Sequence, residues 1–236
     1  MILGIILFIL VIAISFILAV QSMKDYQEIP SQTGEEYGVF LIRKPYQFSP
    51  DLLTSFHADC LDSGLVISFE RLVKGTKSAL LVYGPKKLLI NHKNILDLLE
   101  LEDYAANVQE GILAWEVGMK SGKAHAEDVK NYFKKFPLLS EEEQFWWQLV
   151  LSANKDLSNP RKSFQAQIRA VLFSPDQNKR MNLAQTLQNL VPGKLTKLPK
   201  AFSDAQIIDF YQKRSLRKDG RNPLLASDEI LQLLSL

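Results

Sequence analysis

Three adjacent carboxylates stand beside two adjacent tryptophans in the stretch SEEEQFWWQLVL, residues 140–151. Paired carboxylates can serve as a general acid and a general base, but only where different surroundings separate their pKa values. Glu141, Glu142 and Glu143 follow one another directly, and we expect them on one solvated loop that offers no such separation. The sequence therefore predicts no catalytic acid pair at this place.

The residues after these glutamates have the two-residue period of a strand. From Gln144 to Leu151 the side chains alternate between two faces. One face, which holds Trp147, is wholly apolar, and we expect it in a core. The other face mixes glutamines with Trp146, and we expect it to be half exposed.

A second stretch with a chemical signature is KRSLRKDGR, residues 213–221, in which five of nine residues are basic. Clustered Lys and Arg side chains release counterions when they bind nucleic acid, so this stretch can contact phosphate. The alternative is the solvated end of a surface helix. The candidate phosphate-contacting residues are Lys213, Arg214, Arg217, Lys218 and Arg221.

Other catalytic and metal-binding patterns are missing from the sequence. Residues 75–78, GTKS, have the letters of a phosphate-binding loop in the wrong order and fall in an expected hairpin. His57 and Cys60 share a helical face, but two ligands do not make a zinc site. His92 lies on an apolar stripe, where a core or boundary position is expected, and His125 lacks the cysteine pair of a zinc deaminase. Since no nucleophile, base and orienting group come together, we predict no catalytic residue, no cofactor and no metal.

The first set of elements that would position these residues lies between residues 37 and 120, in the order β-α-β-β-α-β. Two right-handed crossovers around a hairpin give a four-stranded antiparallel sheet with both helices on one face. The sequence thus predicts a ferredoxin-like α+β sandwich. The expected strands are residues 37–44, 65–73, 78–84 and 111–120. The expected helices begin at Pro50 and Pro85, and apolar residues at helical spacing carry the second helix from Leu88 to Leu99.

A second α+β domain is predicted at residues 138–236. The tetrapeptide FSPD occurs at 48–51 and again at 173–176, each time between an expected strand and an expected helix. It is either a trace of duplication or recurring helix-capping chemistry, and we favour capping. The expected elements are strands at 144–151, 163–173 and 194–202, and helices that follow Asp176, Ser203 and Ser227.

The first twenty residues carry no charged side chain. Twenty helical residues rise roughly 30 Å, the thickness of the hydrocarbon core of a bilayer. A cleaved signal peptide is the alternative, but it would begin with a basic segment. We therefore predict an uncleaved transmembrane anchor at 1–20 and a polar tether at 21–36. Lys24, Arg43 and Lys44 follow the span, which predicts a single-pass protein of the cytoplasmic membrane with its soluble domains in the cytoplasm.

Charge is distributed unevenly along the chain, although the net charge is only +2. Residues 97–143 hold 11 acidic and 5 basic side chains, a net of −6, while residues 155–221 hold 14 basic and 5 acidic, a net of +9. This asymmetry indicates either an anionic partner or ordinary solvation. Cys60 is the single cysteine, so no disulfide can form within the chain and a reducing compartment is expected.

Three stretches of the second domain resemble the region ahead of the motor in membrane-associated type IV secretion and conjugation ATPases. They are EEEQFWWQLVLS, SFQAQIRAVLFSPDQNKRMNLAQTL and FSDAQIIDFYQKRSLRKDGRNPLLASDEILQLLSL. In that family a Glu-Gln-x-Trp-x-Gln strand, an arginine-containing stretch and a Leu-x-x-Glu-[IL]-x-x-Leu helix lead into the ATPase domain. The matching positions are Glu143, Gln144, Trp146, Gln148, Arg214 and Ser227 to Leu234.

The resemblance covers residues 60–236 and implies assembly and docking, since none of its motifs is catalytic. The chain ends at Leu236, where the family pattern expects the motor to begin, so we expect the motor ATPase to be separate. The predicted function is that of a membrane-anchored, non-catalytic cytoplasmic assembly module whose partner is an ATPase or further copies of itself. The alternative is a membrane-tethered protein that binds nucleic acid or acidic lipid through residues 194–221.

Overall fold

The structure is a computed structural model. Of the 236 residues it describes 10–16, 26–27, 35–45, 48–106, 110–119, 136–154, 163–190, 195–198, 202–217 and 223–234.

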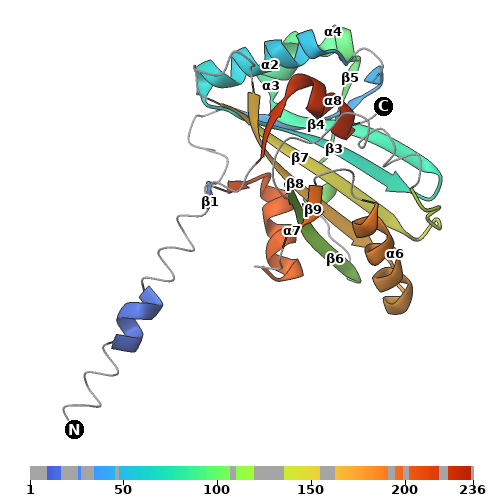
Figure 1. Cartoon of the computed structure of the whole chain (residues 1–236). Helices are drawn as coiled ribbons and strands as arrows, with labels where there is room; N and C mark the ends of the chain where they lie inside the picture. The colour runs from blue at the N-terminus through green and yellow to red at the C-terminus, as the bar shows by residue number, and fades with distance from the viewer. Residues whose placement is uncertain are drawn as a thin grey trace.

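In the part of the chain that the structure describes, nine strands form a single sheet, and all of their pairings are antiparallel (Figure 1). The strands are β2 (Tyr37–Ile42), β3 (Val66–Lys74), β4 (Lys77–Pro85), β5 (Leu98–Leu101), β6 (Ile112–Met119), β7 (Gln144–Ala153), β8 (Ser163–Phe173), β9 (Leu195–Lys197) and β11 (Leu224–Ala226). Eight of them lie side by side in the order β5-β2-β4-β3-β7-β8-β6-β9. Strand β11 pairs with β8 at the end that β6 leaves free.

The two halves of this sheet repeat one strand order. In chain order, β5-β2-β4-β3 is the fourth, first, third and second strand of its half, and β9-β6-β8-β7 is the same series. The halves meet where β3 and β7 pair continuously, from Val66 opposite Ser152 to Lys74 opposite Gln144. The two second strands therefore join both halves into one sheet.

The prediction of a ferredoxin-like sandwich followed by a separate second domain is wrong, because one sheet contains the strands of both. Residues 111–120, predicted as the fourth strand of the first sandwich, form β6 and lie beyond β8. The edge position beside β2 belongs to Leu98–Leu101, which the sequence pattern placed in a helix. Periodicity identifies a strand from its own residues, but it does not identify the strand that pairs with it. The α+β class with an antiparallel sheet is confirmed.

Among the described residues, five helices cover one face of the sheet, which we call the first face. They are α2 (Pro50–Ser63), α3 (Lys86–Asn91), α4 (Lys93–Leu96), α6 (Gln177–Asn189) and α8 (Ser227–Leu234). Their apolar side chains and those of the sheet make one continuous core, in which Phe56, Phe69, Trp147 and Leu187 are almost completely buried. Burying one side chain of this size contributes roughly 1.5–3 kcal/mol, so this core carries most of the stability of the fold.

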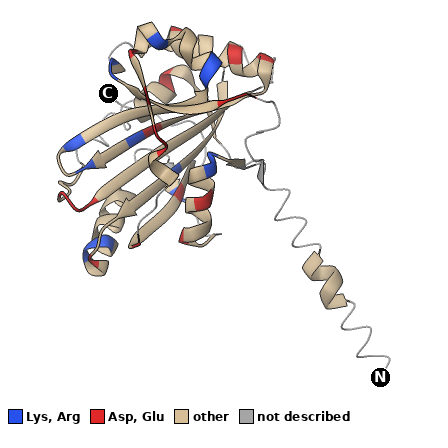
Figure 2. Ribbon diagram, turned by 180° about the vertical axis from the view of Figure 1, so that it is seen from behind, with Lys and Arg blue, Asp and Glu red and all other residues tan. Residues whose placement is uncertain are grey.

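Fewer of the described elements cover the opposite face of the sheet, which we call the second face. Helix α7 (Asp204–Lys213), the short 3-10 helix η3 (Tyr104–Ala106) and the two-stranded ribbon of β1 (Tyr26–Gln27) with β10 (Leu216–Arg217) lie here. The apolar contacts of this face form two smaller clusters, one around Ile207 and Tyr211 and one around Leu216. Charged residues also occur on strands in the middle of the sheet (Figure 2).

The two copies of FSPD use different residues as helix caps. Ser49 accepts a hydrogen bond from the Leu52 amide at the start of α2, whereas Asp176 accepts one from the Lys179 amide at the start of α6. The first copy follows the first strand of its half and the second copy follows the third strand of the other half. The copies are therefore not equivalent positions, which agrees with recurring capping chemistry.

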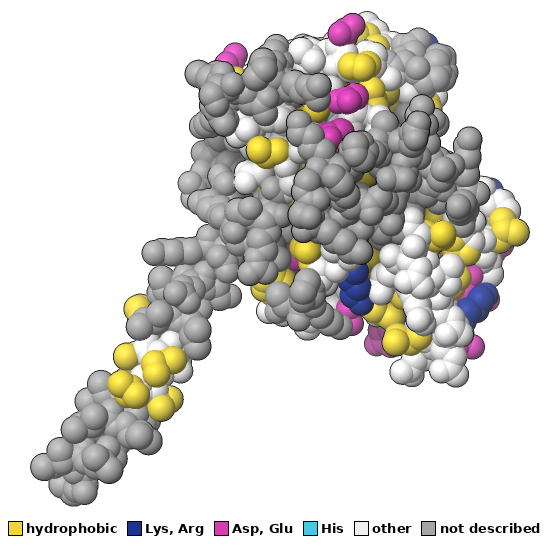
Figure 3. All heavy atoms as spheres, in the orientation of Figure 1, with side chains coloured by type: hydrophobic (Ala, Val, Ile, Leu, Met, Phe, Trp, Pro, Cys, Tyr) yellow, Lys and Arg dark blue, Asp and Glu magenta, His cyan; other side chains and the backbone are white. Residues whose placement is uncertain are grey.

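None of the helices that the structure describes is both long and apolar enough to cross a membrane. Within the predicted span of 1–20 the structure describes residues 10–16, which are helical with exposed apolar side chains (Figure 3). The rest of the predicted span lies outside the described residues. We correct the transmembrane anchor accordingly, and with it the predicted single-pass location at the cytoplasmic membrane.

Part of the predicted polar tether at 21–36 makes defined contacts. Strand β1 places Tyr26 opposite Arg217. Glu35 and Glu36 form ion pairs with Lys87 and Lys86. The described part of the segment is therefore attached to β10 and to α3.

Candidate functional site

Three rows of side chains cross the second face of the sheet, each row made of direct cross-strand partners. The first row is Lys74, Gln144, Phe173 and Ile112; the second is Leu72, Trp146, Val171 and Ala114; the third is Glu70, Gln148, Arg169 and Glu116. Because side chains on one face recur every second residue, all three rows project to the same side. The face thus changes from apolar at one end to charged in the middle of the sheet.

Every residue of the first two rows except Ala114 lines a pocket of about 330 Å³, which we call the Trp146 pocket. Its lining is largely apolar and includes Leu72, Tyr104, Ile112, Trp146, Val171 and Phe173. Gln144 and Lys74 also line it, and among the residues that the structure describes Lys74 is the one charged residue of the lining.

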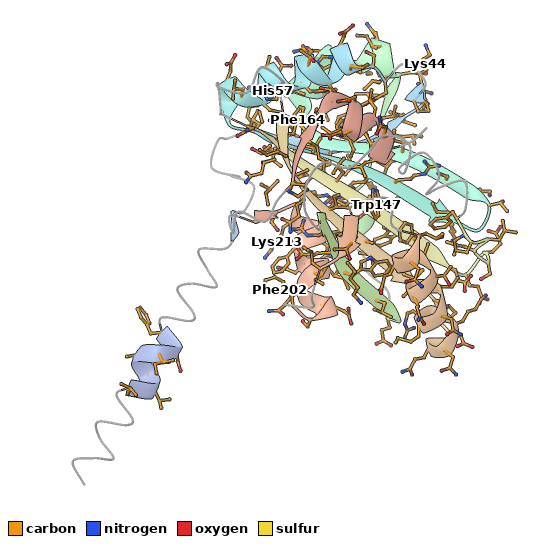
Figure 4. All side chains as sticks on the ribbon, in the orientation of Figure 1. Lys44, His57, Trp147, Phe164, Phe202 and Lys213 are labelled. Carbon is orange, nitrogen blue, oxygen red and sulfur yellow. The ribbon has the colours of Figure 1, made fainter. Side chains whose placement is uncertain are left out.

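Trp146 is the central aromatic side chain of this pocket. Its ring meets the ring of Tyr104 edge-on, with centroids 5.2 Å apart, and lies tilted 5.8 Å from Tyr211. The indole Nε1 donates a hydrogen bond of 3.3 Å to Gln144 Oε1. Its neighbour Trp147 points to the first face and is buried there, as expected (Figure 4).

A buried ion-pair cluster lies directly behind the pocket. Arg214 is 1% exposed, and it donates to the Glu70 carboxylate at 3.0 and 3.3 Å and to Asp103 Oδ1 at 2.9 Å. Its guanidinium lies over the Tyr83 ring, 4.4 Å from the centroid. Burial opposes the charge of Arg214, but Glu70 and Asp103 outweigh this effect and raise its pKa above the ordinary value.

This cluster fixes the wall of the Trp146 pocket. The Tyr104 hydroxyl donates to Glu70 Oε2 at 2.7 Å and lies 2.5 Å from the Tyr211 hydroxyl. Burial, and then the Glu70 charge, raise the pKa of both tyrosines well above the usual value, so both stay neutral. The contacts of the Tyr104 hydroxyl with Glu70 and Tyr211 therefore fix the position of the ring that contacts Trp146.

The third row continues the polar network across the sheet. Gln148 Nε2 donates to Glu70 Oε1 at 3.0 Å and to the Tyr211 carbonyl at 2.8 Å. Arg169 donates to Gln148 Oε1 at 3.2 Å, and its Nε lies 3.5 Å from Glu116. Each buried charge therefore has a partner of opposite sign, which offsets the cost of removing it from water.

The structure separates the predicted phosphate-contacting residues. Arg214 is buried, as described above, while Lys213 is exposed and pairs with Asp209 one helical turn earlier (Figure 4). Arg217 lies in β10, and Lys218 and Arg221 lie outside the described residues. The two that can be compared, Lys213 and Arg214, point to different environments and do not form one basic surface.

Glu141 and Glu142 are exposed, as expected for a solvated loop, but Glu143 is not. Its carboxylate is 1% exposed, accepts from the Ser140 amide at 2.7 Å and lies 2.9 Å from Lys179 Nζ. Burial opposes ionisation, but the Ser140 hydrogen bond and Lys179 prevail and lower the pKa of Glu143. The prediction of a solvated loop is wrong at this residue, because Ser140 and Lys179 replace the water that a carboxylate needs.

The residues that carry the family resemblance have different positions. Gln144 and Trp146 line the pocket, while Gln148 and Arg214 belong to the ion-pair cluster behind it. Helix α8, the last motif, lies on the first face and contributes Ile230, Leu233 and Leu234 to the core. Two of the three motifs therefore meet around one site.

The two described histidines have structural positions. The His57 ring donates to the Ser163 carbonyl at 3.0 Å and meets Phe164 edge-on (Figure 4), and His92 is buried with Nε2 3.5 Å from Asp59. Burial raises the pKa of the Cys60 thiol to about 12. His125 lies outside the described residues. Within the described ranges, no group of three or more His, Cys, Asp or Glu side chains is placed to hold a metal ion.

Sequence reasoning missed the charged residues of the third row. Glu70, Arg169 and Glu116 each interrupt an apolar strand pattern, in SFERL, QIRAV and AWEVG. A charge in the middle of a strand that is apolar on both sides indicates a paired, buried position. Asp103 and Tyr104 carry no such signal, because they lie outside the strands.

No protein-family model matches this sequence, and a search of curated proteins finds no match.

Proposed function

We propose that this protein is a non-catalytic docking module that binds a partner protein through the Trp146 pocket. The partner we propose is the separate motor ATPase of a type IV secretion or DNA-transfer system. The observation that carries the proposal is the apolar pocket between Trp146 and Tyr104, whose two aromatic polar groups are already hydrogen-bonded within the protein.

A pocket of this kind suits an apolar side chain of another protein. Residues that dominate protein interfaces are enriched in Trp and Tyr and act through well-packed pockets from which water is excluded. The indole of Trp146 and the hydroxyl of Tyr104 are satisfied by Gln144 and Glu70, so an apolar occupant leaves neither unpaired. The occupant would gain mainly from burial of apolar surface.

The family resemblance supports the same surface. Of the strand motif Glu-Gln-x-Trp-x-Gln, Glu143 and Gln148 bind other parts of the chain, whereas Gln144 and Trp146 line the pocket. A motif that fixes a strand in the fold and also places a tryptophan in the pocket is consistent with a surface that binds the motor ATPase.

The test uses the full chain and the purified motor ATPase of the secretion or transfer system from the same cells. We expect calorimetry to detect binding, and we expect Trp146→Ala to weaken it by about tenfold or more, as for a central interface residue. Leu72→Gln, at the pocket floor, serves as a second variant should Trp146→Ala fold poorly. Met181→Ala is the matched control, since Met181 is exposed on α6, against the other face.

Absence of binding by the wild-type chain would contradict the proposal. So would equal affinities for the wild-type chain and both pocket variants. Hydrolysis of ATP by the full chain alone, above background, would contradict its non-catalytic part.

A further inference from the structure

Two lysines stand opposite each other at the Lys74 end of the Trp146 pocket. Lys74 ends β3, and its direct cross-strand partner across the hairpin is Lys77, so both side chains project to the second face. Both lysines are exposed. Like charges directly opposite each other repel, so this pair is unfavourable unless an anion lies nearby.

The described part of the chain supplies no ion-pair partner to either lysine. The Glu141 carboxylate lies against Gly75, in the turn between the two lysines. Arg71, two residues before the pocket residue Val73, donates to Ser78 and to the Leu234 carbonyl. The pocket therefore has an apolar floor with the lining residue Lys74 at one end and Lys77 beside it. Within the described part of the chain, neither lysine forms an ion pair.

We propose, on the basis of the docking function above, that the pocket selects a partner segment in which an apolar side chain has a carboxylate beside it. The apolar side chain enters between Trp146 and Tyr104, and the carboxylate lies against Lys74 and Lys77. The partner is thus an acidic, amphipathic protein segment. An exposed ion pair adds a modest preference, about two- to five-fold in affinity.

Two capped dipeptides test this inference on the full chain. They are N-acetyl-Phe-Glu-amide and N-acetyl-Phe-Lys-amide, and NMR follows the indole Nε1–H signal of Trp146, assigned by its loss in Trp146→Phe. Trp115 and Trp147 are buried in the core and serve as internal references. We expect both peptides to shift the Trp146 signal and Phe-Glu to bind about two- to five-fold more tightly.

Charge reversal provides the decisive comparison. We expect Lys74→Glu to abolish the preference for Phe-Glu, because the new carboxylate lies opposite Lys77 and neutralises it. Lys93→Glu is the control, because Lys93 is exposed on α4, on the first face, and we expect it to leave the order unchanged.

The inference is overturned by equal affinities for the two peptides in the wild type. It is also overturned if neither peptide moves the Trp146 signal. Neither result affects the calorimetric test with the motor ATPase. That test examines the docking function separately, through the loss of binding expected in Trp146→Ala.

Discussion

Arg214 ends α7 in the left-handed backbone conformation, with φ 49°, and its side chain turns into the molecule. There it joins Glu70 from β3 to Asp103, which follows β5, and the same Glu70 holds the Tyr104 hydroxyl. One cation thus secures the end of a helix, and through Glu70 it secures the wall of the pocket. A basic residue that looked available for phosphate is an internal structural residue.

Replacing Arg214 with Met should therefore destabilise the protein strongly. The substitution leaves Glu70 buried without its cation, and breaking a buried pair in this way costs about 3–5 kcal/mol. Lys213→Met removes the adjacent exposed cation and should cost less than about 1 kcal/mol. Urea unfolding at neutral pH measures both. A loss for Arg214→Met as small as that of the control would contradict this structural role.

Glu143 should make stability depend on pH in the acid range. Its pKa is lower in the folded protein than the ordinary value of about 4.3. The Glu143 carboxylate therefore makes its full contribution to the free energy of unfolding above that ordinary value. This contribution is lost as pH falls through the folded pKa. We expect Glu143→Gln to lower the free energy of unfolding at pH 7 by about 1.5–3 kcal/mol, since charge-assisted hydrogen bonds are lost.

The difference between wild type and Glu143→Gln should shrink in urea titrations as pH falls from about 4.3 through the lowered folded pKa, because protonated Glu143 is neutral like glutamine. Glu142→Gln, at the exposed neighbour, should match the wild type throughout. A difference that stays constant from pH 7 to pH 3 would show that Glu143 acts through packing and not through its charge.

Among the elements, those with strong local signals were predicted well. The alternation around Trp147 identified β7, and the serine caps at 49 and 203 marked where α2 and α7 begin. These signals depend on neighbouring residues in the chain, so they can be recognised without knowledge of the fold.

Strand β5 shows where local signals fail. Leu99 continues the helical spacing of the residues before it, yet Asp97 adopts a positive φ of 51° and ends α4. Residues Leu98–Leu101 then pair with β2. The backbone hydrogen bonds that β2 offers outweigh the helical pattern, and β2 lies more than fifty residues earlier in the chain.

At the scale of the whole molecule, the continuous pairing of β3 with β7 makes both halves one structural unit. The core on the first face also runs through both halves without interruption. Small proteins with one shared core usually unfold in a single cooperative step.

We therefore expect one transition in urea for the full chain. Trp115, Trp146 and Trp147 all lie in the second half, so tryptophan fluorescence reports on that half, whereas far-ultraviolet circular dichroism reports on both. The two curves should coincide. Separate midpoints would show that the halves unfold independently, as the two-domain prediction requires.

The sequence by itself determined the α+β class, most strands and helix starts, and the inward direction of Trp147, because each follows from the spacing of nearby side chains. Only the tertiary structure decided that the strands form one sheet and that Trp146 and Tyr104 enclose a pocket. It alone also placed Arg214 against Glu70, 144 residues away in the chain. Contacts across such distances depend on which strands pair, and no local pattern of residues contains that information.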